Sequence, residues 1–176
     1  MNLSLSKADR FAEKIVSELK PLCEKIEVAG SIRRRRPVVG DIDLVILPKY
    51  KPAVQARCKR NALKVIMDGE INLIVELSNG VQLDIFFAHG QEKDLFGVVN
   101  ESTWGTLLLC RTGSKDFNIW IANTAARKGF HWNPYLGIHG HPPSPGEPAP
   151  IIASETEEDI FKVLGLDYIT PEARER

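Results

Sequence analysis

The sequence predicts an α+β fold, in which a mixed sheet carries helices on one face and is followed by a small helical/β subdomain. The elements read from the sequence follow the order helix, strand, strand, helix, hairpin, helices, loop and helix, which favours a sheet covered by helices on one side. Hydrophobic residues make up 43% of the chain and charged residues 26%, as in folded globular proteins. A change in composition near residues 95–105 divides the chain, so we expect one subdomain at 1–98 and another at 99–176.

Two helices are expected in the first half. Apolar side chains recur at helical spacing over residues 6–20, and Ser6 and Asp9 have the spacing of a capping box at its start. Pro52 suits the first turn of a second helix, which we extend over residues 52–66.

The strands of the first half are bounded by glycine and proline. Residues 26–29 and 41–47 are rich in aliphatic and β-branched side chains, so each is expected to be a strand. The runs 71–77 and 81–87 flank Ser78-Asn79-Gly80, and an Asn-Gly pair between two such runs is a strong hairpin signal.

The second half is predicted to be mainly helical. Helices are expected over 101–111, from an N-cap at Ser114 to residue 128, and over 155–164, where acidic residues in the first turns suit the helix dipole. The proline-rich segment 139–150 is expected to be a loop between two short extended pieces.

Composition excludes several classes of protein. The 176 residues contain neither a bilayer-length apolar run nor a secretory signal, so we expect no membrane span and an intracellular protein of cytoplasmic, nucleoid, nuclear or viral setting. The three cysteines, Cys23, Cys58 and Cys110, are widely spaced, which argues against a disulfide framework or a thiolate metal site.

The basic residues are unevenly distributed although the net charge is zero. Residues 1–90 carry 15 Lys and Arg against 11 Asp and Glu, and residues 91–176 carry 8 against 12. Four arginines are consecutive at 33–36. Such a run can bind phosphate, but it is equally compatible with a solvated charged surface or an import signal.

Three carboxylates are expected to converge on one face of the sheet. Side chains alternate across a strand, so Asp41 and Asp43 point the same way, roughly 7 Å apart along it. Asp84 lies on the polar face of its own strand and joins them if the two strands are neighbours. Clustered carboxylates repel one another, and oxygen-only ligands suit Mg²⁺, so the cluster predicts a site for two magnesium ions, with Mn²⁺ as an alternative. The Asp-x-Asp pattern alone is common in proteins without a metal.

The turn before the acidic strand adds a second signal. Gly30 and Ser31 can direct backbone N–H groups and a hydroxyl at a phosphate, and the arginines that follow can make bidentate contacts with it. The combined pattern Gly-Ser-Ile-Arg-Arg-Arg-Arg-Pro-Val-Val-Gly-Asp-Ile-Asp-Leu at 30–44 resembles the signature of the nucleotidyltransferase superfamily, and specifically of the family X DNA polymerases, which include DNA polymerase beta. The segment Val-Gln-Leu-Asp-Ile-Phe at 81–86 matches the third carboxylate.

The second half extends the resemblance over nearly the whole chain. The segments 111–118, 126–130 and 133–135 are similar to the thumb of these polymerases, and 154–161 with 171–174 are similar to their final helix and tail. Other nucleotidyltransferases share only the first half. The resemblance therefore implies a nucleotidyltransferase-type palm at 1–98 and a thumb at 99–176.

The resemblance also implies roles for matching residues. Asp41, Asp43 and Asp84 would hold the metal ions, and Asp84 would accept the proton of the primer 3′-hydroxyl. Contacts with the incoming nucleotide would come from the positions that match the family's two nucleotide-binding segments: Gly30, Ser31, Arg33, Arg34, Gly40, Gly113, Ser114, Lys115, Phe117 and Asn118. Among them, Phe117 would line the nascent base pair and Asn118 would donate to an acceptor in its minor groove. The partners would be a dNTP and a primer-template or gapped duplex, bound by a monomer.

Several positions depart from the family pattern. Cys110 and Arg111 replace an aromatic pair that restricts the sugar, so we expect weakened exclusion of ribonucleotides. Ala122 stands where some relatives have an arginine that grips the template, and Gln82 and Phe86 replace arginines beside the third aspartate. We expect modest DNA affinity and relaxed fidelity as a result.

The sequence favours a DNA-directed DNA polymerase that fills short gaps in repair, and two alternatives remain. A nucleotidyltransferase acting on a small molecule, RNA or protein would share the three carboxylates without needing the thumb. A non-catalytic module that binds DNA ends would not need all three carboxylates.

Overall fold

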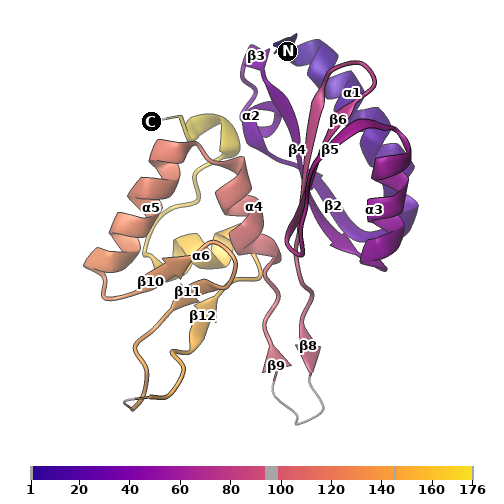
Figure 1. Ribbon diagram of the computed structural model, residues 1–176. Coiled ribbons are helices and arrows are strands. Elements are labelled where there is room, and N and C mark those ends of the chain that lie inside the picture. The colour runs from indigo at the N-terminus through magenta and orange to yellow at the C-terminus, as the bar shows by residue number, and fades with distance from the viewer. Residues whose placement is uncertain (1, 94–98, 145, 176) are drawn as a thin grey trace. The chain divides into compact units, whose positions relative to one another are not determined.

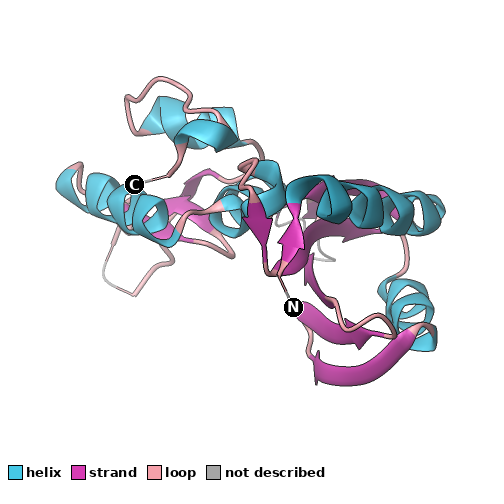
Figure 2. Ribbon diagram, turned by 90° about the horizontal axis from the view of Figure 1, so that it is seen from above, coloured by secondary structure: helices cyan, strands magenta, loops and turns pink. Residues whose placement is uncertain are grey.

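The computed structural model describes residues 2–93, 99–144 and 146–175, and it divides the chain into two compact units. The N-terminal unit is Met1–Ala88 and the C-terminal unit is His89–Arg176, so the division lies somewhat earlier than the boundary after residue 98 that composition suggested. Figure 2 shows that helices and strands occur in both units. None of the helices formed by these residues is long and apolar enough to cross a membrane.

The N-terminal unit is built around a five-stranded mixed sheet (Figure 1). Its strand order is β2-β4-β7-β6-β5, and a separate short pair joins β1 to β3. The elements of this unit are β1 (Leu3–Ser4), α1 (Leu5–Leu19), η1 (Lys20–Leu22), β2 (Cys23–Val28), α2 (Gly30–Arg33), β3 (Val38–Val39), β4 (Asp41–Pro48), α3 (Lys51–Arg60), β5 (Ala62–Asp68), β6 (Asn72–Leu77) and β7 (Gln82–Phe87).

The pairing of β4 with β7 decides where the acidic residues meet. These two strands are parallel, while β2, β6 and β5 join the sheet in antiparallel pairs. The register sets Asp43 directly opposite Asp84 and Asp41 opposite Gln82. The predicted mixed sheet and the 71–87 hairpin are therefore confirmed.

The core of this unit lies between the sheet and the two long helices. Buried side chains of β4 and β7, such as Ile42, Leu44 and Ile85, pack with Ala8 and Ala12 of α1 in one hydrophobic cluster. The cluster also includes residues of α3, so both helices cover the same face of the sheet (Figure 1). The alternate residues of the central strands, including the acidic ones, point to the other face.

Two local predictions for this unit were wrong. The helix expected over 52–66 ends at Arg60, and Ala62–Asp68 instead forms the edge strand β5, because its aliphatic residues pair with β6. The N-cap of the first helix is Ser4 rather than Ser6, and Asp9 receives two hydrogen bonds from the Arg35 guanidinium at 2.9 and 3.1 Å. Tertiary contacts override the local signal at both places.

The C-terminal unit combines helices with a three-stranded sheet of order β10-β11-β12. Its described elements are β8 (Glu92–Lys93), β9 (Val99–Asn100), α4 (Trp104–Thr112), α5 (Lys115–Arg127), β10 (His131–Asn133), β11 (Gly137–His139), β12 (Ile151–Ala153), α6 (Glu157–Val163) and η2 (Pro171–Ala173). The predicted N-cap of α5 is confirmed, since Ser114 Oγ accepts the Phe117 N–H at 3.3 Å. The proline-rich loop lies between β11 and β12, as predicted.

An arginine lies at the centre of the C-terminal unit's core. Arg174 is fully buried and donates to the Glu157 carboxylate at 2.6 Å. Its guanidinium lies 5.4–5.5 Å from the ring centroids of Phe117, Phe161 and Tyr168. A buried charge is tolerated only when it is paired, so this contact joins α6 to the segment after η2.

Candidate active site

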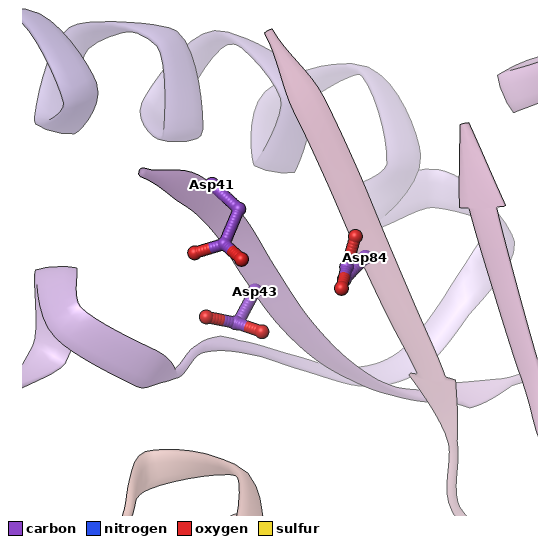
Figure 3. Close-up of side chains that lie close together, drawn as sticks. All are labelled: Asp41, Asp43 and Asp84. Carbon is purple, nitrogen blue, oxygen red and sulfur yellow. The ribbon is translucent and has the colours of Figure 1, made fainter. Parts of the chain in front are cut away.

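Asp41, Asp43 and Asp84 form a compact carboxylate cluster in the N-terminal unit. One carboxylate oxygen from each lies within 4.8 Å of the others, and the side chains point into the same space (Figure 3). Asp41 and Asp43 are partly buried and Asp84 is 9% exposed. The strand alternation predicted this convergence, and the parallel register of β4 and β7 produces it.

The cluster is supported by an unusually close glycine. Gly30 begins α2 with φ +57°, and a Cβ built there would lie 1.8 Å from Asp43 Oδ2. The preceding residue is fixed as well, since Ala29 N–H donates to the Asp43 carbonyl at 2.8 Å. Only glycine combines this backbone conformation with this approach, so Gly30 lets the turn pack directly against the carboxylate.

The turn also holds an unsatisfied hydroxyl. Ser31 Oγ is buried and has no hydrogen-bond partner among the described residues. Such groups are rare in folded proteins, and one beside a polar site indicates a ligand or water that completes it. Arg33 and Arg34 follow at the end of α2 and are half-buried. Gly40 is exposed, and an added Cβ there would meet nothing within 4 Å.

Gln82 is a member of the cluster for which the sequence suggested no contact. Its Nε2 donates to Asp84 Oδ1 at 2.8 Å. The two residues are two positions apart on one strand and therefore share a face. This alternation is the signal that could have predicted the contact, which gives Asp84 a neutral hydrogen-bond donor.

The predicted nucleotide-binding residues of the C-terminal unit lie at the start of α5. Gly113 caps α4 with φ +70°, and Lys115 is exposed in the first turn of α5. The Ser114 hydroxyl has a second internal contact besides the cap, because it donates to the Arg174 carbonyl at 2.9 Å. The Ser114 hydroxyl thus both caps α5 and links the start of this helix to the segment at Arg174.

The structure corrects the expected role of Phe117. This side chain is completely buried and packs with Trp120 and Phe161, whose ring centroids lie 5.5 and 6.2 Å away. It belongs to the core cluster of the C-terminal unit and presents no surface to a base pair. Ile121, Thr124 and Ala125 of the same helix are buried as well, so this side of α5 is a packing surface.

Asn118 hydrogen-bonds within the chain. Its Nδ2 donates to the Cys110 carbonyl at 2.8 Å, while its Oδ1 is buried without a partner among the described residues. The donor that was expected to read a minor-groove acceptor is thus committed to α4. Nearby, Arg111 donates to the Tyr135 hydroxyl, and its guanidinium lies 5.4 Å from that ring's centroid.

Comparison with known proteins shows what the chain is similar to. The DNA polymerase beta thumb family matches residues 107–175. The PolX DNA polymerase/3′-5′ exonuclease of Bacillus subtilis is 30% identical over 170 residues, covering 94% of this chain and 27% of that protein. The repair DNA polymerase X of an African swine fever virus isolate from Namibia is 26% identical over 164 residues, covering 89% of this chain and 84% of that protein. The chain is thus similar to family X DNA polymerases over most of its length, and its residues 107–175 match the polymerase beta thumb family.

Solved structures show a similar fold. The polymerase beta of Leishmania infantum, in a ternary P/T complex, superposes with a TM-score of 0.73 at 19% identity, covering all of this chain and 77% of that one. Its ternary gap complex gives a TM-score of 0.72 at 17% identity and 71% coverage. The chain spans only about a quarter of the length of the Bacillus family X relative.

Proposed function

We propose that this chain is a family X DNA-directed DNA polymerase that adds deoxynucleotides to a primer 3′ end and fills short gaps in DNA repair. The observation that carries the proposal is the convergence of Asp41, Asp43 and Asp84 beside the turn at Gly30 and Ser31. The names of the viral relatives as repair polymerases support it. In this reading the N-terminal unit is the palm and the C-terminal unit is the thumb.

The cluster fits a pair of Mg²⁺ ions, with Mn²⁺ as an alternative. Its donors are carboxylate oxygens only, on a face that is not fully buried, and hard cations prefer such ligands. When bound, the ions supply charge stabilisation for in-line displacement at the α-phosphate. The three aspartates would hold them, and Asp84 would also accept the proton from the primer hydroxyl.

The remaining residues of the turn would bind the triphosphate. Ser31 supplies the buried hydroxyl that has no partner within the described chain. Arg33 and Arg34 supply guanidinium groups, which suit phosphate oxygens because their donors form a planar fork. Gly40 leaves open space next to the acidic strand.

The C-terminal unit would contact the nascent base pair through the start of α5. Gly113, Ser114 and Lys115 form this helix start, and Asn118, one turn further on, would have to release the Cys110 carbonyl to contact the base pair. Phe117 would act by holding α5 in the core. Primer-template or gapped duplex would be held mainly through its phosphates by a monomeric protein, so binding should weaken steeply with salt.

Gap filling on a labelled duplex, with and without Mg²⁺, tests this function. The protein should extend the primer by the gap length only when Mg²⁺ is present. Asp84→Ala should abolish extension and leave DNA binding largely intact, because it removes a carboxylate and no phosphate contact. Asp167→Ala, at an exposed aspartate of the C-terminal unit, is the matched control and should extend normally. Extension by the Asp84→Ala protein, or transfer only to free nucleotides or small molecules, would contradict the proposal.

A further inference from the structure

The face of the N-terminal unit that carries α1 and α3 contains a groove that the polymerase function does not use. The groove has a volume of about 770 Å³. Its walls come from α1, the end of α3, the start of β5 and the turn between β6 and β7 (Figure 1). Leu83 lines a recess beneath it, and the next residue, Asp84, points to the other face of the sheet. The groove therefore opens on the face opposite the carboxylate cluster.

The bottom of the groove is apolar. A recess of about 40 Å³ lies there, walled by core side chains that include Leu19, Cys58, Leu77 and Leu83. This space is larger than one water needs, and water is poorly held where the walls offer few polar partners. A recess of this kind fits an aliphatic side chain.

The rim of the groove is basic. Lys14 and Arg60 are both exposed and have no ion-pair partner among the residues that the structure describes. The one acidic residue in the lining, Glu18, already accepts from Arg57 at 3.1 Å. The rim thus has an excess of positive charge, which is complementary to carboxylates.

A buried donor marks the same place. Arg57 lines both the groove and the recess, and its Nε is buried without a hydrogen-bond partner among the described residues. An unsatisfied guanidinium N–H at the edge of an apolar recess is costly unless an acceptor reaches it. A carboxylate or a peptide carbonyl beside an aliphatic anchor would supply that acceptor.

We propose that this groove binds a segment of a partner protein in which an aliphatic side chain is flanked by Asp or Glu. The aliphatic side chain fills the recess, and the acidic residues meet Lys14, Arg60 and the Arg57 Nε. A buried anchor surrounded by complementary charge is the usual organisation of an energetically dominant contact. Nucleic acid would satisfy the charges but leave the recess empty. Addition of a strand to β5 is disfavoured, because that edge carries two register irregularities.

A set of labelled peptides tests the proposal by fluorescence polarisation with the full chain. Each peptide has one central Val, Leu, Ile or Ala between acidic residues, and a matched set replaces the acids with Asn and Gln. We expect the acidic peptides with Val, Leu or Ile to bind, and the Ala and amide peptides to bind about tenfold more weakly.

Variants separate the two parts of the site. The double change Lys14→Glu with Arg60→Glu should weaken peptide binding by at least about tenfold. Cys58→Val enlarges a side chain inside the recess and should remove the preference for Leu over Ala. Lys128→Glu, one charge reversal of the same kind at an exposed lysine of the C-terminal unit, is the control. All three proteins should keep the wild-type melting temperature within a few degrees and the wild-type extension rate within about twofold.

Two results would overturn the proposal. One is that no peptide of the set binds, or that the binding observed does not depend on both the basic rim and the recess. The other is that duplex DNA displaces the peptides and loses affinity with the Lys14 and Arg60 changes but not with Cys58→Val, which would make the groove a phosphate-binding surface. Loss of gap filling has no bearing on either result, so the two proposals fail independently.

Discussion

The two units position their candidate functional groups by different means. In the N-terminal unit the aspartates come from two neighbouring strands, and their direction follows from alternation and register. In the C-terminal unit the candidate groups come from the start of one helix, and packing decides which of them face outward: Phe117 is buried and Ser114 is used in two internal hydrogen bonds. A strand therefore reveals its polar face through local sequence, whereas a helix start reveals it only when its neighbours are known.

The test of this comparison with the largest expected effect is the substitution of Gly30, which lies beside the strand that carries Asp41 and Asp43. Gly30→Ala should lower the rate of primer extension by at least about 10²-fold, because the new Cβ overlaps the Asp43 carboxylate and must displace it. It should also cost about 1–3 kcal/mol of unfolding free energy, since φ is +57° at this position. Single-turnover kinetics and urea unfolding measure the two effects. Gly40→Ala, where a Cβ meets nothing, should leave stability unchanged, and equal stability losses in the two variants would refute the geometric argument.

A second test concerns the buried ion pair of the C-terminal unit. Arg174→Met should reduce the unfolding free energy by about 3–5 kcal/mol, because it leaves Glu157 buried without its cation. Adding Glu157→Gln to this variant should recover part of the loss. Asp9→Asn breaks the more exposed pair with Arg35 and should cost only about 0–1 kcal/mol. If chemical denaturation gives similar losses for the two pairs, burial is not what distinguishes them.

A third test concerns the sugar of the incoming nucleotide. The resemblance implies that Cys110 and Arg111 replace an aromatic pair, so we expect a discrimination of dNTP over rNTP of no more than about 10²-fold in kcat/KM. Replacing the pair with Tyr and Phe should raise this ratio. Side-by-side steady-state incorporation of matched dNTP and rNTP measures it. Strong rejection of ribose by the wild-type protein would refute this prediction.

The smallest expected effects concern the thiols, which report on the two units separately. Burial raises the pKa of the Cys58 thiol to about 12 and that of Cys23 to about 11, and it also raises the pKa of Cys110 in the other unit. The native protein should therefore react slowly with iodoacetamide at pH 8. Single-cysteine variants labelled at increasing urea concentration would show which unit opens first. Labelling of all three thiols at the rate of a free thiol without denaturant would contradict their burial.

The same thiols predict a loss of stability at alkaline pH. Their pKa values are higher in the folded protein than the ordinary value of 9.0, so above pH 9 the unfolded chain releases protons that the folded chain retains. The unfolding free energy should fall as pH rises from about 9 towards 11–12. Replacing Cys23 and Cys58 with Ala should flatten this part of the pH profile in urea-unfolding experiments.

Much of the N-terminal unit could be predicted from the sequence, because its signals are local. Alternation in 41–47 and 81–87 gave the acidic face, and the Asn79-Gly80 pair gave the hairpin. The strand at 62–68 was missed because its pairing with β6 outweighs the continuation of the preceding helix. No local sequence pattern predicts that Gly30 lies against Asp43, because this contact forms only when the turn packs against β4.

The sequence was less informative about the C-terminal unit. The cap at Ser114 was predictable, but the burial of Phe117 depends on aromatic side chains and an arginine that lie far along the chain. The same is true of Asn118, whose amide is held by a carbonyl on the preceding helix. The orientation of side chains on short helices and loops thus depends on contacts with residues far along the chain, which a single sequence does not reveal.

The hydrogen bond from Ser114 to the Arg174 carbonyl has a consequence for biosynthesis. The two residues are 60 positions apart, so a ribosome that has just made the start of α5 must add nearly all the rest of the unit before this bond can form. Until then the aromatic side chains that surround Arg174 lack the cation that fills their centre. The C-terminal unit should accordingly become protease-resistant late in translation, after the N-terminal unit has already folded.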